Sequence, residues 1–198
     1  MAIDFTLTPE LEDIRVRVRT FIDDVVRPGE ERIGDRDELD RADYIKILLE
    51  MRAAAQEQGL WLPHMPTEWG GMGLGHVELA MVQAEGAKTR LGPWVMNCQA
   101  PDEGNMHTLL HWGTDEQKER YLRPLCEGKA MSCFAMTEPE VAGSDPTLIQ
   151  TRAYQDGDEW VINGHKWFIS NAHRSQFAIL LARTEDDPDL PQAANTAF

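Results

Sequence analysis

The residues best suited to chemistry lie in two short segments of the second half of the chain. The first, residues 132–145, reads SCFAMTEPEVAGSD. An apolar stretch runs into a loop of small residues, where Gly143 lets the backbone approach a ligand closely and consecutive N–H groups can bind an anion. Ser144 adds a hydroxyl that can donate a hydrogen bond to a phosphate oxygen. The same residue types also occur in ordinary turns, so a plain surface loop is the alternative.

The second segment, residues 163–171, reads NGHKWFISN. If it is a strand, alternation places Phe168 and Ser170 on one face and Trp167 and Ile169 on the other. An aromatic ring beside a hydroxyl suits a planar heteroaromatic ligand, because the ring packs on the ligand and the hydroxyl bonds one of its ring atoms. Core packing of an aromatic hairpin is the alternative.

Other reactive residues form weaker patterns. His107 and His111 are four residues apart and share a helix face, but without a third ligand or a nearby carboxylate they predict no metal site. The three cysteines, Cys98, Cys126 and Cys133, form no CxxC pair. They predict neither a disulfide framework nor a zinc site, and are typical of a reducing cytosol. Standard nucleotide-loop, serine-nucleophile and zinc-hydrolase motifs are absent.

Two kinds of secondary structure must position these segments. Up to about residue 128 apolar residues recur at helical steps, and Thr8 followed by Pro9 predicts the start of the first helix. Pro28 and Gly29 predict its end. Beyond residue 129 the pattern becomes strand-like, so a helical domain, residues 1–128, is followed by an antiparallel β region, residues 129–198.

Turn signals mark that β region. The pairs Asp156-Gly157 and Asn163-Gly164 each predict a hairpin turn. Residues 177–182 are a continuous apolar run that predicts a buried strand. The last residues, 195–198, look like the start of another strand, so the sheet ends on an unpaired edge.

Composition excludes several classes of function. Among 198 residues, Lys and Arg number 19 and Asp and Glu number 34, which gives a formal net charge of −15. Such a balance argues against binding to nucleic acid or to an anionic membrane surface. No apolar run is long enough to span a bilayer, and no secretory signal is present. Backbone N–H groups can still bind a small anionic ligand.

Four segments, in their order and spacing, resemble the acyl-CoA dehydrogenase family. They are residues 61–75, residues 97–105 followed by 113–118, residues 134–145, and residues 162–170. The resemblance implies an N-terminal helical domain, a middle β-domain and a C-terminal helical bundle, with FAD bound non-covalently. The expected fold class is therefore α+β, with an all-α domain (1–128) followed by an incomplete antiparallel β-barrel domain (129–198). The resemblance implies that the C-terminal bundle would lie beyond residue 198.

The same resemblance implies roles for individual residues. The implied cofactor-binding residues are Phe134, Ala135, Met136, Thr137, Ser144, Phe168, Ile169 and Ser170. Backbone groups of residues 134–137 would face the flavin ring, and Ser144 would contact the pyrophosphate and the CoA substrate. Phe168 would pack beside the isoalloxazine, and Ser170 would hydrogen-bond near flavin N5. The family commonly has Trp and Thr at these last two positions, and the loop 140–143 is one residue longer than the common form.

The implied reaction removes two hydrogens from the α and β carbons of an acyl-CoA. A carboxylate base takes the α proton while hydride passes to flavin N5. The family base lies in the C-terminal bundle, so no catalytic residue is assigned, and we expect the chain to be an inactive N-terminal portion of the enzyme. Glu138 and Glu140 are not matched to that role.

The resemblance also implies a setting. The partners would be an acyl-CoA of medium-to-long chain, an electron-transfer flavoprotein as acceptor, and further copies in a homodimer or homotetramer. The expected setting is fatty acid β-oxidation in the cytoplasm. An acyl-CoA oxidase or a flavin monooxygenase of the same fold is the alternative, as is a non-catalytic scaffold that lacks the base.

Overall fold

The computed structural model describes residues 6–143, 145–185 and 195–198. Two compact units make up the chain, Met1–Glu103 and Gly104–Phe198. The predicted domain boundary at residue 128 stays a prediction, because compactness and domain membership are different criteria. No helix within these described ranges is both long enough and apolar enough to cross a membrane.

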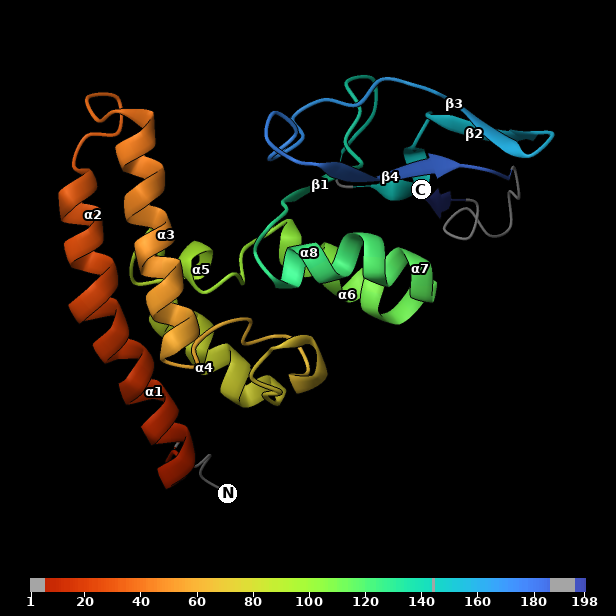
Figure 1. The fold of residues 1–198 in the computed structure, drawn as a ribbon. Helices are drawn as coiled ribbons and strands as arrows, with labels where there is room; N and C mark the ends of the chain where they lie inside the picture. The colour runs from red at the N-terminus through yellow and green to blue at the C-terminus, as the bar shows by residue number, and fades with distance from the viewer. Residues whose placement is uncertain (1–5, 144, 186–194) are drawn as a thin grey trace. The chain divides into compact units, whose positions relative to one another are not determined.

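The first unit is helical. Its elements, in chain order, are α1 (Pro9–Phe21), η1 (Ile22–Val26), α2 (Arg27–Ile33), α3 (Arg41–Glu57), η2 (Thr67–Trp69), α4 (His76–Gly86) and α5 (Gly92–Val95). The first three form a continuous run of helical backbone, with α3 beside α2 (Figure 1). Thr8 caps α1 as predicted, since its hydroxyl accepts a hydrogen bond from the Leu11 N–H at 3.3 Å. The core is apolar and includes Val18, Phe21, Ile22, Val26, Leu48, Met51 and Ala55.

The helical run does not end where the sequence predicted. Pro28 stands in the first turn of α2, where a missing N–H is tolerated. Gly29 is buried against α3, and a Cβ there would lie 2.2 Å from Met51 Sδ. The glycine therefore serves a close approach of two helices, and the helix instead stops before Gly34, which has a φ of 55°.

The second unit combines short helices with a sheet. Its elements are most of α6 (Asp102–Trp112), then α7 (Asp115–Gln117), η3 (Lys118–Leu122), α8 (Arg123–Cys126), β1 (Ser132–Ala135), η4 (Pro146–Leu148), β2 (Arg152–Asp156), β3 (Glu159–Asn163), β4 (Phe177–Arg183) and β5 (Asn195–Ala197). The strand order is β1-β4-β2-β3, with β5 also paired to β4. The apolar run 177–182 thus forms a strand as predicted, with Ile179 and Ala182 buried.

The sheet is mixed, which corrects the expected antiparallel barrel. β4 runs parallel to β1 and to β2, while the pairs β2–β3 and β4–β5 are antiparallel. The described strands do not close into a barrel. The physical reason lies between β1 and β4, where the chain makes a hairpin and a long loop before it re-enters the sheet in its original direction.

Only one of the two predicted hairpin turns is present. The Asp156-Gly157 turn joins β2 to β3, with Gly157 in the left-handed region at φ 63°. After Asn163 the chain instead leaves the sheet. Gly164 is required there by close packing, because a Cβ would lie 2.1 Å from Thr151 Oγ1 and 2.7 Å from Thr151 Cα.

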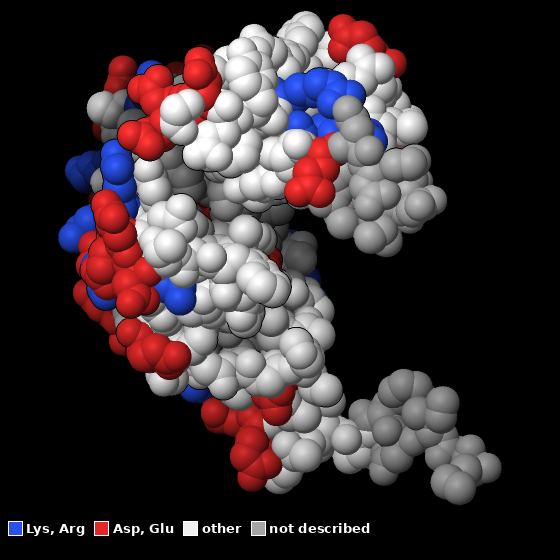
Figure 2. Space-filling view, turned by 90° about the vertical axis from the view of Figure 1, so that its right-hand side faces the viewer, with Lys and Arg blue, Asp and Glu red and all other residues white. Residues whose placement is uncertain are grey.

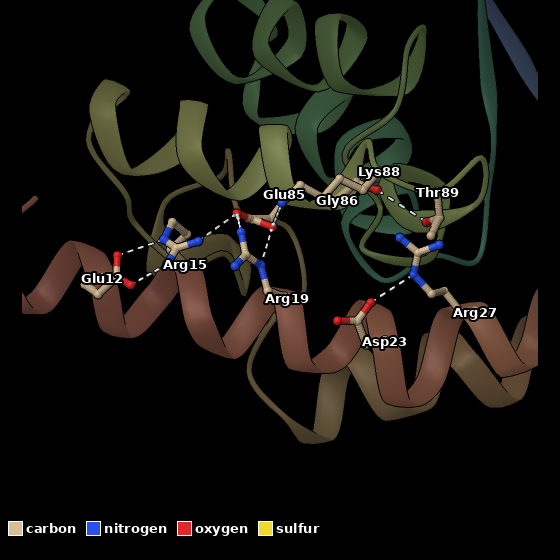
Figure 3. A network of polar contacts seen from close by, with 9 residues as sticks. All are labelled: Glu12, Arg15, Arg19, Asp23, Arg27, Glu85, Gly86, Lys88 and Thr89. Atoms are coloured by element: carbon tan, nitrogen blue, oxygen red, sulfur yellow. Dashed lines mark hydrogen bonds and ion pairs between the residues drawn. The ribbon is translucent and has the colours of Figure 1, made fainter. Parts of the chain in front are cut away.

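A buried carboxylate joins α4 to α1. Glu85 accepts hydrogen bonds from Arg15 at 3.2 Å, Arg19 at 2.8 Å and Lys88 at 2.5 Å (Figure 3). The Glu85 side chain is only 7% exposed. Burial opposes its ionisation, but the hydrogen bonds from the three cations outweigh that effect and lower the pKa of Glu85 to about 2. Three partners for one carboxylate give this contact more weight than an exposed pair.

Replacing this carboxylate by its amide tests the network. We expect Glu85→Gln to lower the free energy of unfolding by about 2 kcal/mol at neutral pH, because three cations lose their anionic partner. Urea denaturation followed by circular dichroism measures the change. The matched control is Glu119→Gln, which removes an exposed i,i+4 pair with Arg123 and should cost less than about 0.5 kcal/mol.

The stability difference between the unaltered chain and Glu85→Gln should also depend on pH. The pKa of Glu85 is depressed from 4.5 to about 2, so its contribution is complete above 4.5 and is lost as the pH falls toward 2. The difference in stability between the unaltered chain and Glu85→Gln should shrink across that window. A difference that is constant from neutral pH down to the acid limit contradicts the assignment.

Candidate functional site

The first candidate segment starts on β1 and continues past its end. β1 stands at one end of the strand order, and β4 is its only strand partner among the described residues. Asn105 fixes the start of the strand, because its buried amide donates to Ser132 Oγ at 2.8 Å and to Cys133 O at 3.1 Å. Residues 134 and 135 are the last two of this strand, and residues 136 and 137 follow it directly. The other edge of the strand pairs with no described strand.

An ion pair lies within this segment, just after residues 134–137. Glu138 Oε1 accepts from Lys166 Nζ at 2.8 Å, and the two side chains are 2% and 9% exposed. The carboxylate also accepts from the Gln150 N–H at 2.7 Å and the Thr151 N–H at 2.8 Å. Burial opposes its ionisation, but these hydrogen bonds outweigh that effect and hold the pKa of Glu138 at about 2. A carboxylate so committed is a poor proton acceptor, which agrees with giving it no catalytic role.

The two candidate segments lie side by side. Lys166 Nζ donates a second hydrogen bond to Met136 O at 2.8 Å. The Trp167 N–H donates to Thr137 O at 3.0 Å. The structure thus brings residues 136–138 and 166–168 together, although roughly thirty residues separate them along the chain.

Phe168 adopts a conformation that alternation along a strand does not allow. β3 ends at Asn163 and residues 164–169 form no strand, so the prediction that residues 167–170 alternate between two faces is wrong. The φ of Phe168 is 51°, in the left-handed region, which costs a non-glycine residue about 1–2 kcal/mol. Its side chain is 81% exposed. The ring lies against that of Trp167, with centroids 4.4 Å apart.

The residues after Phe168 turn back toward the sheet. Ile169 is half-buried and Ser170 is exposed, and the Ile169 carbonyl accepts from the Ala172 N–H at 3.2 Å. Asn171, also left-handed at φ 68°, accepts two hydrogen bonds from Arg174. Phe168 and Asn171, the left-handed residues at the two ends of this turn, set the course of the backbone between them. A strained backbone that the surroundings hold in place is a common mark of a functional site.

Ser144 lies outside the described residues. Its neighbour Gly143 is placed, and a Cβ there would lie 2.6 Å from Thr137 Cγ2. Gly143 therefore packs closely on the side chain of Thr137, which a Cβ at this position would force to shift.

Charge at the surface is mostly acidic. On the face shown in Figure 2, Asp and Glu side chains cover more area than Lys and Arg, in keeping with the net charge of −15. The buried ammonium of Lys166 is neutralised by Glu138. Lys166 therefore offers no uncompensated positive charge to a phosphate-bearing ligand.

Across the described ranges, no group of three or more His, Cys, Asp or Glu side chains could hold a metal ion. His107 and His111 stack with ring centroids 6.1 Å apart. The three cysteines are buried and none of them is in a disulfide, and burial raises the pKa of both Cys98 and Cys126 to about 12.

A second region of interest is the segment 97–105, one of the four segments that carry the family resemblance. Its first residue is held by Arg52, whose guanidinium lies 4.7 Å from the ring centroids of both Trp61 and Trp94. Arg52 donates to Trp94 O at 3.0 Å and to Asn97 Oδ1 at 3.3 Å. Burial lowers the pKa of Arg52 to about 10, so it stays charged at neutral pH. This cation fixes the loop from which the segment starts.

The described residues fit the planar heteroaromatic part of a cofactor. The exposed phenyl ring of Phe168 follows Trp167, whose N–H is bonded to Thr137 O, and the exposed residue Ser170 comes two positions later. The ring can pack on a ligand plane, while N–H and O–H groups can bond to its edge.

Sequence reasoning missed the residues that hold the site together. From the sequence, Lys166 and Glu138 have no role beyond lying in the two candidate segments. Asn105 has none beyond lying in the segment 97–105 that resembles the family. A signal was available, because a Glu after an apolar strand and a Lys before an aromatic pair are charges placed where burial is expected. Their pairing depends on the fold and cannot be read from local spacing.

The chain belongs to the acyl-CoA dehydrogenase family. The family model for the acyl-CoA dehydrogenase N-terminal domain matches residues 8–129. The model for the acyl-CoA dehydrogenase middle domain matches residues 133–198. The predicted family and the α+β fold class are confirmed, with a mixed, open sheet as the one difference.

Individual relatives agree with this assignment. Acyl-CoA dehydrogenase family member 11 of Homo sapiens is 35% identical over 189 residues, which cover 92% of this chain and 24% of that protein. A structure from Mycobacterium abscessus, assigned to the acyl-CoA dehydrogenases, is 34% identical with a TM-score of 0.88 and covers 98% of this chain and 50% of that one. A glutaryl-CoA dehydrogenase from Mycobacterium smegmatis, solved with FADH2, is 26% identical with a TM-score of 0.71, covering 97% and 45%. This chain thus spans half or less of their lengths.

The close packing at Gly164 gives a test of the site's geometry. We expect Gly164→Ala to lower the free energy of unfolding by about 1–3 kcal/mol, because the new methyl group overlaps the backbone of Thr151. Thermal unfolding measures the change. The matched control is Gly104→Ala, where a Cβ meets nothing within 4 Å and the helical position favours alanine. Equal stability of the two variants contradicts the described packing.

Proposed function

We propose that this chain is an N-terminal portion of an FAD-dependent acyl-CoA dehydrogenase and carries part of its flavin site. The observation that carries the proposal is the cross-link between the two candidate segments, through Lys166 to Met136 O and through the Trp167 N–H to Thr137 O. It brings an exposed aromatic ring and a strand end into one surface. The family assignment and the FADH2 in the glutaryl-CoA dehydrogenase structure support the choice of ligand.

The proposed cofactor contacts follow from the chemistry of each group. Backbone groups of residues 134–137 would bond to the polar edge of the flavin, and Phe168 would pack beside the ring. The hydroxyl of Ser170 would donate a hydrogen bond near N5. Ser144 would contact the pyrophosphate and the CoA arm of the substrate. The chemistry that FAD supplies when bound is acceptance of a hydride.

The protein's share of the reaction is to make an α proton removable and to keep water out. A thioester α proton is weakly acidic, so hydrogen bonds to the substrate carbonyl must stabilise the developing negative charge. Glu138 is buried, ion-paired and of low pKa, which argues against it as the base. We propose that the base comes from outside the half that this chain matches. An acyl-CoA added to this chain with FAD should leave the flavin oxidised.

The remaining features of the proposed enzyme rest on the family resemblance. They are an acyl-CoA substrate of medium-to-long chain, an electron-transfer flavoprotein as acceptor, a homodimer or homotetramer, and a place in fatty acid β-oxidation in the cytoplasm. The hold of Arg52 on Asn97 supports a fixed wall in the segment 97–105, which would border the acyl chain.

Titration with FAD tests the proposal. Flavin fluorescence should be quenched as FAD binds to the unaltered chain, since the ring becomes stacked against protein. Phe168→Ala should raise the dissociation constant about tenfold, because roughly 1.4 kcal/mol of ring packing is lost.

The control is Trp112→Ala, which removes another large exposed ring, 85% accessible, from the end of α6. That variant should bind FAD as the unaltered chain does. Failure of the unaltered chain to bind FAD contradicts the proposed function. Equal weakening by both substitutions contradicts the assignment of Phe168.

A further inference from the structure

The buried Lys166 does not present its charge to a ligand. Its side chain is 9% exposed, and its ammonium already donates to Met136 O and to Glu138 Oε1, each at 2.8 Å. Glu138 is occupied in turn by Lys166 and by the N–H groups of Gln150 and Thr151. Any contribution of Lys166 to a flavin site must therefore pass through the groups that it holds.

The first such group is a peptide plane. In a trans peptide the carbonyl of one residue and the N–H of the next point in opposite directions. Because Lys166 binds Met136 O, the Thr137 N–H is directed away from Lys166. The next peptide is fixed in the same way, since the Trp167 N–H binds Thr137 O. Two successive peptides of the first segment are thus oriented by the second segment.

The second such group is Phe168, two residues after Lys166. Its left-handed backbone, at φ 51°, must be held from both sides. On the N-terminal side the anchors are Lys166 and the Trp167 N–H. On the C-terminal side Asn171 is buried and bonded to Arg174. Loss of the N-terminal anchor would free Phe168 to relax to an ordinary conformation.

We propose that Lys166, paired with Glu138, is a positioning residue that presets the Met136 and Thr137 peptides and the Phe168 ring to receive the flavin. The inference rests on the proposed function and adds to it the residue that prepares the surface before the cofactor arrives. Preorganisation of this kind improves affinity because ordering costs are met during folding.

The test compares FAD binding by Lys166→Met and by Lys129→Met, both in the full chain. Lys129 is a matched control, since it also pairs with a glutamate, Glu127 at 2.9 Å, but its side chain is 73% exposed. We expect Lys166→Met to raise the FAD dissociation constant about tenfold or more, because both the peptides and Phe168 lose their anchor. Lys129→Met should leave it unchanged.

A double variant separates positioning from folding. Lys166→Met alone leaves the Glu138 carboxylate buried without its cation, whereas Glu138→Gln combined with Lys166→Met removes both charges. The double variant should unfold in urea at a concentration closer to that of the unaltered chain. Its dissociation constant for FAD should nevertheless stay above that of the unaltered chain. The visible spectrum of its bound flavin should move toward that of free FAD.

The outcomes of these measurements distinguish the inference about Lys166 from the proposed function. A folded double variant that binds FAD with the affinity and spectrum of the unaltered chain overturns the inference and leaves the proposed function standing. If Lys166→Met binds FAD with the affinity of the unaltered chain, the inference is overturned as well. If the unaltered chain binds no FAD, the proposed function fails and the inference fails with it.

Discussion

The buried ion pair between Glu138 and Lys166 is the interaction on which the candidate site depends. Neither charge is tolerable alone at its depth, where the side chains are 2% and 9% exposed. The two segments must therefore be buried together, and the segment of β1 becomes fixed only when the loop after β3 is in place. The pair also brings the Gln150 and Thr151 amides to the same carboxylate, which extends the constraint to the start of β2.

The helical unit uses a related device for a different purpose. Glu85 is a buried carboxylate as well, but its partners Arg15, Arg19 and Lys88 are partly exposed cations that reach it from α1 and from the end of α4 (Figure 3). Water can still solvate these cations, so the network secures helix packing without specifying a single geometry. The Glu138–Lys166 pair is almost completely buried, and Lys166 orients an individual peptide group, as a ligand-binding surface requires.

The features that sequence predicted well are local ones. The cap at Thr8 and the Asp156-Gly157 turn both depend on residues within one or two turns of chain. Predictions failed where glycine serves a distant contact. Gly29 was predicted to end a helix and Gly164 to make a hairpin, yet one is pressed against Met51 and the other against Thr151. No local pattern distinguishes these two uses of glycine.

The most direct test of this account is a backbone amide NMR titration of the unaltered chain with FAD. Cross-peaks of Met136, Thr137 and Phe168 should move together, with one dissociation constant, because the ion pair makes their segments a single surface. Amides in the Glu85 network should stay in place. Shifts in only one of the two segments, or shifts with different dissociation constants, would contradict the claim that Glu138 and Lys166 unite them in one flavin site.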